Sequence, residues 1–184
     1  MDDLVAVLDA DVLVPILTCD LLLTAFELHL YQPVLTNKIL AEVERNLLRA
    51  HPDLDPTPLR RRVKVMRRAL RINIHADTEG DKSAEGINPK DRHVVSAALD
   101  VHASVVVTND RRLRREIAAL DRPLRALSAD DFAVVLIERD PDAVDDVITD
   151  LVLKRVRRPV TRDQLIGELS GPLPSFAQRL RSHA

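Results

Sequence analysis

The chain contains the stretch Val5-Ala6-Val7-Leu8-Asp9, in which four apolar residues run directly into a carboxylate. A short, continuously apolar run of this kind is typical of a strand buried on both faces of a parallel sheet. A second such stretch, Val105-Val106-Val107-Thr108-Asn109, ends at Asp110. In an open α/β sheet the carboxyl ends of parallel strands meet at one edge, where ligands bind. We therefore expect Asp9 and Asp110 to lie together at that edge.

Strand-like and helix-like segments alternate along most of the chain. The predicted strands cover residues 5–8, 33–35, 71–75, 104–108 and 124–127. Apolar residues at helical spacing predict helices over 11–30 with a break near Pro15, 37–50, 58–70, 89–101 and 129–139, and a short helix from Arg111. Residues 77–88, rich in Gly, Asp and Ser, are predicted to form a flexible loop. This alternation predicts an α/β fold with a central parallel sheet.

The pattern changes from Pro141 onward, because no strand is predicted after Leu127. One amphipathic helix is marked by Val144, Val147, Ile148, Leu151 and Val152, and another by Leu165, Ile166 and Leu169. We therefore divide the chain into an α/β domain at 1–139 and a C-terminal helical extension at 140–184. The apolar stripe of the extension has to be covered. We expect it to pack on the chain's own core or on a dimer mate.

Composition limits the class of protein. The chain has 184 residues, 46% of them apolar and 30% charged, which suits one globular domain with an appendage. The net charge of -2 means that any nucleic-acid contact must come from local basic patches. Cys19 is the only cysteine, which excludes an intramolecular disulfide and a cysteine zinc cluster. No apolar run approaches the ~18 residues of a membrane span, so we expect a cytoplasmic protein without membrane contact.

Two further acidic segments lie between the strand-end acids in the sequence. Asp91 closes the turn Asn88-Pro89-Lys90-Asp91, and a helix-like segment near 40–47 carries Glu42 and Glu44. Any one of these acids is best explained as a helix cap or a solvated side chain. Four that converge would repel one another unless a cation neutralised them. Oxygen ligands favour Mg²⁺ or Mn²⁺ over zinc, so the joint pattern predicts a divalent-metal site.

Four stretches in this order resemble the motifs of PIN-domain ribonucleases, in their bacterial VapC-like toxin branch. They are 7–15, 39–47, 89–98 and 105–110, and the resemblance spans about residues 4 to 138. It implies a PIN-like three-layer fold over 1–139 and marks Asp9, Glu42, Asp91 and Asp110 as catalytic acids that hold Mg²⁺ or Mn²⁺. Asp11 stands where many relatives have Asn or Ser, and Asp110 where close relatives often have Asn.

The same resemblance implies an endoribonuclease, a hydrolase that cuts RNA by metal-activated water as the toxin of a type II toxin-antitoxin pair. It also implies a homodimer and a cognate antitoxin protein as partners. Glu42 rests on the resemblance alone, because Glu44 lies closer to the centre of the apolar helix face, so Glu44 remains the alternative. His93 could contact a phosphate, but a packing or surface role is commoner, and we leave it outside the catalytic set.

Basic residues follow Asp110 directly. Arg111, Arg112, Arg114 and Arg115 are therefore the best placed to bind an RNA backbone beside the metal. The other basic clusters, at 60–71 and 154–158, are ordinarily solvated helix faces, and we prefer that interpretation for the second. The few aromatic residues offer no platform for base stacking.

Two other classes of function compete. The stretches around Asp9-Ala10-Asp11-Val12 and Val105 to Asn109 also resemble the first two motifs of haloacid-dehalogenase-type phosphatases, with Asp9 as nucleophile. That scheme needs a lysine and then an acidic pair after the threonine motif, and Lys154 comes after Asp130-Asp131, in the wrong order. The third class is a non-catalytic PIN-like interaction module.

Overall fold

The computed structural model describes residues 4–77 and 84–182. Five parallel strands form the central sheet: β1 (Val5–Leu8), β2 (Gln32–Thr36), β3 (Ile74–His75), β4 (Val105–Val107) and β5 (Arg125–Leu127). Their order across the sheet is β3-β2-β1-β4-β5. The chain thus leaves β1 toward β2 on one side and later returns to place β4 on the other. This change of direction beside β1 is a topological switch point, where α/β sheets bind ligands.

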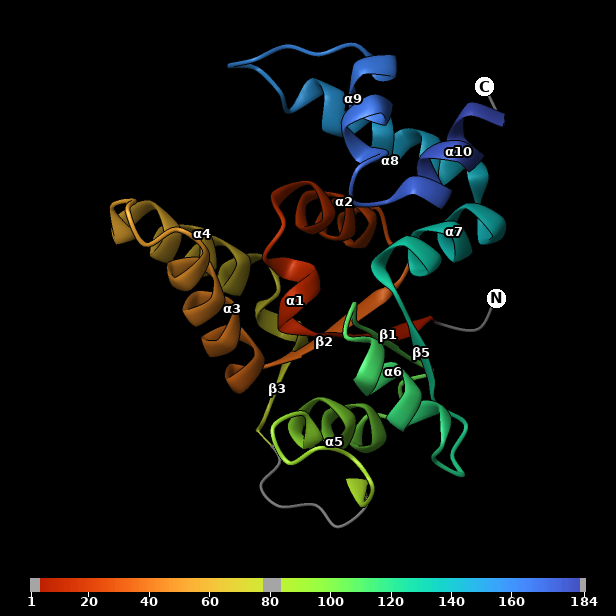
Figure 1. Ribbon diagram of the computed structural model, residues 1–184. Helices are drawn as coiled ribbons and strands as arrows, with labels where there is room; N and C mark the ends of the chain where they lie inside the picture. The colour runs from red at the N-terminus through yellow and green to blue at the C-terminus, as the bar shows by residue number, and fades with distance from the viewer. Residues whose placement is uncertain (1–3, 78–83, 183–184) are drawn as a thin grey trace.

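Helices cover both faces of the sheet, which confirms the predicted three-layer α/β fold. Figure 1 shows α5 (Arg92–Asp100) and α6 (Arg111–Ala118) on one side, and α1 (Ala10–Leu13), α2 (Ile16–Glu27) and α7 (Ala129–Arg139) on the other. Beside β2 and β3 lie α3 (Asn37–Ala50) and α4 (Pro56–Ala69). All residues of β4 and all of β1 except the partly buried Val5 are buried between these layers, as their continuous apolar runs predict.

Two predicted elements differ in the structure, and the break predicted in a third is present. The helix predicted from residue 89 starts at Arg92, because Asn88 Oδ1 accepts a hydrogen bond from Lys90 N (3.1 Å) and its C=O accepts one from Asp91 N (2.9 Å), which makes a turn. The strand predicted over 71–75 is wrong in its first half, where a 3₁₀ turn covers Arg71–Asn73. The break predicted near Pro15 is confirmed, because it divides the segment predicted over 11–30 into α1 and α2.

The C-terminal extension folds back on the domain. It consists of α8 (Pro141–Leu153), α9 (Arg162–Leu169) and α10 (Pro174–Ser182). Four residues of the predicted stripe are buried in the same hydrophobic core as the sheet, and the fifth, Val152, is partly buried against it. Figure 1 shows these helices stacked beyond α2 and α7. The expectation that the stripe packs on the chain's own core is confirmed, whereas the domain boundary at Arg139 stays a prediction.

The sequence did not predict α10. Its first turn receives its cap from a distant residue, because Asp130 on α7 accepts hydrogen bonds from Ser175 N (3.1 Å) and Phe176 N (2.9 Å). Of the loop predicted at 77–88, residues 78–83 lie outside the described residues, and Ala84 and Ile87 are buried. Among the helices that the structure describes, none is both long and apolar enough to cross a membrane.

Candidate functional site

Asp9 and Asp110 lie at the carboxyl edge of the two central strands. Leu8 of β1 stands opposite Val107 of β4, and Asp9 N donates a hydrogen bond to Val107 O (3.0 Å). Each acid therefore follows its strand at the switch point of the sheet. The sequence prediction that strand ends bring these two acids together agrees with this geometry.

Both acids also cap the helices that follow them. Asp9 Oδ1 accepts a hydrogen bond from Ala10 N (2.6 Å), while its Oδ2 accepts one from the Thr108 hydroxyl (2.7 Å). Asp110 Oδ1 accepts from Arg112 N (2.7 Å) and Leu113 N (3.2 Å). The capping interpretation and the site interpretation thus apply to the same residues. The caps fix the direction of each carboxylate, as a binding site requires.

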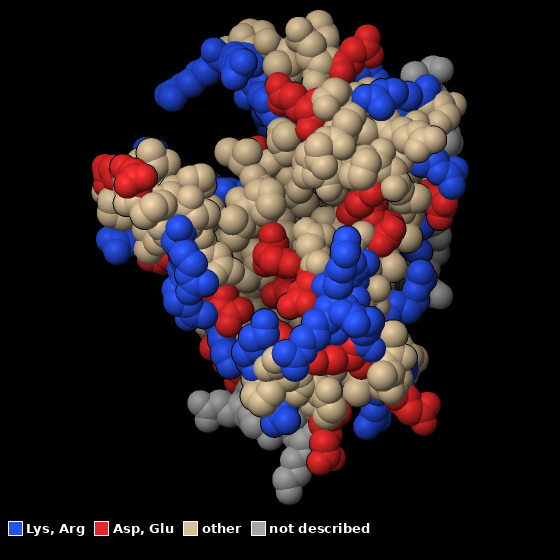
Figure 2. Space-filling view, viewed as in Figure 1, with Lys and Arg blue, Asp and Glu red and all other residues tan. Residues whose placement is uncertain are grey.

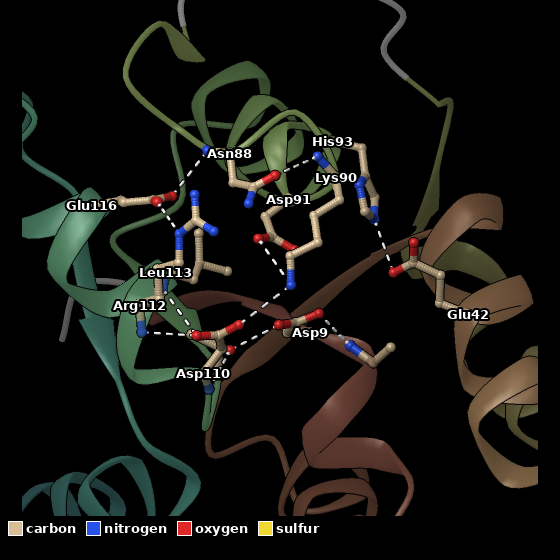
Figure 3. Close-up of polar contacts among 12 residues, drawn as sticks. Asp9, Glu42, Asn88, Lys90, Asp91, His93, Asp110, Arg112, Leu113 and Glu116 are labelled. Atoms are coloured by element: carbon tan, nitrogen blue, oxygen red, sulfur yellow. Dashed lines mark hydrogen bonds and ion pairs between the residues drawn. The ribbon is translucent and has the colours of Figure 1, made fainter. Parts of the chain in front are cut away.

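Asp91 differs from these two because its side chain caps nothing, although it stands at the start of α5. Its Oδ2 is buried and accepts no hydrogen bond from the described residues. Lys90 Nζ lies 3.6 Å from Asp91 Oδ2 and 3.7 Å from Asp110 Oδ2 (Figure 3). Sequence reasoning missed this lysine, since its only signal there was its place next to Asp91.

The structure brings Glu42, rather than Glu44, toward the other acids. Glu42 Oε2 lies 3.2 Å from His93 Nε2, and Figure 3 shows Glu42 facing the site from α3. Glu44 pairs instead with Arg60 on α4, at 3.3 Å. His93 is buried beside Glu42 and therefore belongs to the candidate site, although the sequence prediction left it outside the catalytic set.

The pKa values reflect the crowding of carboxylates. Burial raises the pKa of Asp9, and the nearby charges of Asp91 and Glu42 raise it further. Burial also raises the pKa of Asp91, although Lys90 opposes this effect. For Asp110, burial is outweighed by the hydrogen bonds from Leu113 N and Arg112 N and by Lys90, which together lower its pKa. Two of the acids are thus destabilised as anions, which a cation would relieve.

The donor set suits a hard divalent cation in its chemistry. It consists of carboxylates from separate elements, and Asp91 Oδ2 is a buried oxygen without a hydrogen-bond donor in the described part of the chain. Asp11 Oδ1, two residues after Asp9, is a second such oxygen. In this arrangement, however, no group of three or more acidic, His or Cys side chains among the described residues is close enough to enclose an ion. The ammonium group of Lys90 lies between Asp91 and Asp110.

The four predicted RNA-binding arginines lie on α6 but differ in their surroundings. Arg111 and Arg115 are exposed, and Arg115 Nε donates to Arg111 O (3.2 Å). Arg112 pairs with Glu116 (2.6 Å), and the half-buried Arg114 lies 3.7 Å from Asp131. Figure 2 shows acidic side chains at the centre of this face, bordered by basic side chains over α6.

Comparison with known proteins shows which family the chain belongs to. A family model described as PIN domain matches residues 5–112, which include β1, α3, α5, β4 and the start of α6. The chain belongs to the PIN domain family. The resemblance inferred from the four sequence motifs is thereby confirmed. All four predicted acids fall within the matched part of this PIN domain.

A curated relative extends the comparison. The PIN domain chain is 32% identical over 92 residues to VapC50 of Mycobacterium tuberculosis, which is named as a candidate ribonuclease. The match covers 50% of this chain and 54% of the relative, so the chain spans about half the length of the curated relative that it matches. No solved structure matches the chain.

Proposed function

We propose that this PIN domain is a divalent-metal-dependent endoribonuclease and the toxin of a type II toxin-antitoxin pair. The observation that carries the proposal is the place of Asp9 and Asp110 at the adjoining ends of β1 and β4, with Asp91 linked to Asp110 through Lys90 and Glu42 facing them from α3. The family and the name of the curated relative support the same class of reaction.

The residues divide the work as follows. Asp9, Asp91, Asp110 and Glu42 hold Mg²⁺ or Mn²⁺, and the helix caps keep Asp9 and Asp110 in place. An ion held there would supply Lewis-acid chemistry for phosphodiester hydrolysis by water. His93 orients Glu42. The exposed Arg111 and Arg115, with Arg112 and Arg114, attract the RNA backbone to the site.

Removal of one ligand charge tests the proposal. Asp9→Asn and Asp110→Asn keep an amide oxygen that can cap α1 and α6, so both variants should fold. RNA cleavage in Mg²⁺ or Mn²⁺ should fall about 100-fold or more, because even groups that only orient metal ligands contribute about 10- to 100-fold. Asp146→Asn, an exposed acid on α8, is the matched control and should cleave RNA like the parent. Folded site variants with the parent's cleavage rate would remove those positions from the site.

The same assay separates the competing classes. The protein is incubated with structured RNA and with a phosphomonoester, each with and without Mn²⁺. A nuclease cuts the RNA and forms no covalent enzyme intermediate. Release of phosphate with a phosphorylated Asp9 and intact RNA would establish the phosphatase. If neither substrate reacts, with or without Mn²⁺, the result would favour the interaction module.

The partners belong to the proposal as well. A cognate antitoxin should be encoded next to this chain as a small DNA-binding protein, and co-expression with it should suppress RNA cleavage. Light scattering of the purified chain should give the mass of a homodimer.

A further inference from the structure

Lys90 reaches the acidic site from the turn that precedes α5. Asn88 Oδ1 accepts a hydrogen bond from Lys90 N (3.1 Å), which holds the backbone of this turn. Asn88 N in turn donates to Glu116 Oε2 on α6 (2.9 Å), so the turn is tied to the helix that Asp110 caps. Figure 3 shows the Lys90 side chain extended toward Asp91, Asp110 and Asp9. The backbone thus directs one ammonium group into the acidic site.

The ammonium group acts through its charge. Lys90 Nζ lies 3.6 Å from Asp91 and 3.7 Å from Asp110, distances longer than a charge-assisted hydrogen bond of about 2.7–2.9 Å. The Asp91 side chain is only 16% exposed, whereas the Lys90 side chain is 63% exposed. The carboxylate is therefore fixed in the site, while the lysine can rotate into solvent at small cost.

We propose that Lys90 is an internal counter-cation that competes with the divalent ion for Asp91 and Asp110 and so weakens metal binding. This inference rests on the proposed function, since it concerns the same acids. Lys90 neutralises part of the carboxylate repulsion in the metal-free protein and has to move away from both acids when the ion binds. The metal requirement of this chain is then set by a residue that is not itself a ligand.

Calorimetric titration with Mn²⁺ in the absence of RNA tests the proposal. Lys90→Met removes the competing charge and should lower the Kd for Mn²⁺ by about 3- to 10-fold, the range expected for two ion pairs made by one exposed lysine. Lys90→Arg keeps the charge and should stay within about twofold of the parent. Lys64→Met, an exposed lysine on α4, makes the same change in net charge and should leave the Kd unchanged. The advantage of Lys90→Met should shrink at high salt, where exposed pairs are screened.

The outcomes separate this inference from the proposed function. A parent protein that binds Mn²⁺ and a folded Lys90→Met variant with the same or a weaker affinity would overturn the role of Lys90 alone. Equal gains in affinity for Lys90→Met and Lys64→Met would also overturn it, since net charge would then explain the effect. A parent protein that binds no Mn²⁺ would instead refute the metal-dependent function on which the inference rests.

Discussion

Asp11 has a strongly raised pKa at the edge of the site. Its Oδ2 accepts a hydrogen bond from Asn109 N (2.9 Å), whereas its Oδ1 is buried without a donor in the described residues. Burial, and after it the charge of Asp9, raises the pKa of Asp11 to about 7. Near neutral pH the metal-free protein therefore keeps a proton on Asp11 in a large fraction of molecules.

This raised pKa predicts how the stability of the metal-free protein depends on pH. The unfolded chain releases the Asp11 proton near the ordinary value of 3.8, and the folded chain releases it near 7. Between these values the folded state binds more protons, so the free energy of unfolding falls as pH rises toward 7 and levels off above it. Asp9 shifts in the same direction. Asp11→Asn should therefore raise Tm at about pH 8 by a few °C and flatten its pH dependence.

Thermal unfolding in EDTA from about pH 5 to pH 8 measures this effect. Asp146→Asn, on the exposed face of α8, is the control for removal of one carboxylate. An Asp11→Asn variant that loses stability with rising pH as steeply as the parent would show that Asp11 does not titrate in this range.

At the scale of elements, α10 is joined to the domain by a cap from another helix. Asp130 lies in the first turn of α7, and both of its oxygens accept hydrogen bonds from the first turn of α10. The apolar side of α10 contributes the buried Phe176 and Leu180 to the core. A single carboxylate on α7 thus caps the first turn of the last helix.

Replacement of this cap should loosen α10. Asp130→Ala leaves two backbone N–H groups of α10 without an acceptor and should cost about 1 kcal/mol of stability, the usual value for a lost helix cap. Urea unfolding measures the change, with Asp146→Ala as the control on an exposed helix face. Hydrogen exchange should become faster in the first turn of α10 and stay unchanged in α5. Equal stability of Asp130→Ala and the parent would mean that apolar packing alone positions α10.

At the scale of the whole molecule, one hydrophobic core runs from the sheet into the C-terminal extension. Ile148 and Leu151 of α8 are buried, and Lys154 links the end of α8 to α2 through Glu27, at 2.7 Å. The acids of the site come from residues 9 to 110, on the other side of α2 and α7 from α8 (Figure 1). The extension is thus expected to stabilise the domain without contributing a metal ligand.

Truncation after Arg139 tests this division. The shortened chain exposes the apolar surface of α2 and α7, so it should lose stability or solubility or change its oligomeric state. Any folded fraction should keep metal-dependent RNA cleavage. In the full-length chain, Ile148→Ala should cost about 2–5 kcal/mol at this buried position while cleavage is retained. A folded truncated protein that neither binds Mn²⁺ nor cuts RNA would place the extension in the active site.

The amino-acid sequence by itself determined the features that depend on local pattern. Apolar runs identified β1 and β4, helical spacing identified α3 and α7, and the residues after each strand placed Asp9 and Asp110 at one edge. These predictions succeed because burial on two faces and helix periodicity each produce a pattern of apolar residues within a short stretch of sequence. The family resemblance added Glu42, which periodicity alone did not select.

Only the tertiary structure decided the features that depend on side-chain direction and on contacts between distant residues. Lys90 extends to Asp110, and Glu42 faces His93 while Glu44 turns to Arg60. Neither the turn before α5 nor the helical periodicity of α3 specifies the directions of these side chains, because several rotamers fit the same backbone. The cap that Asp130 gives to α10 joins residues 45 and 46 positions apart. Such contacts arise only after the core has brought the elements together, so no local pattern in the sequence records them.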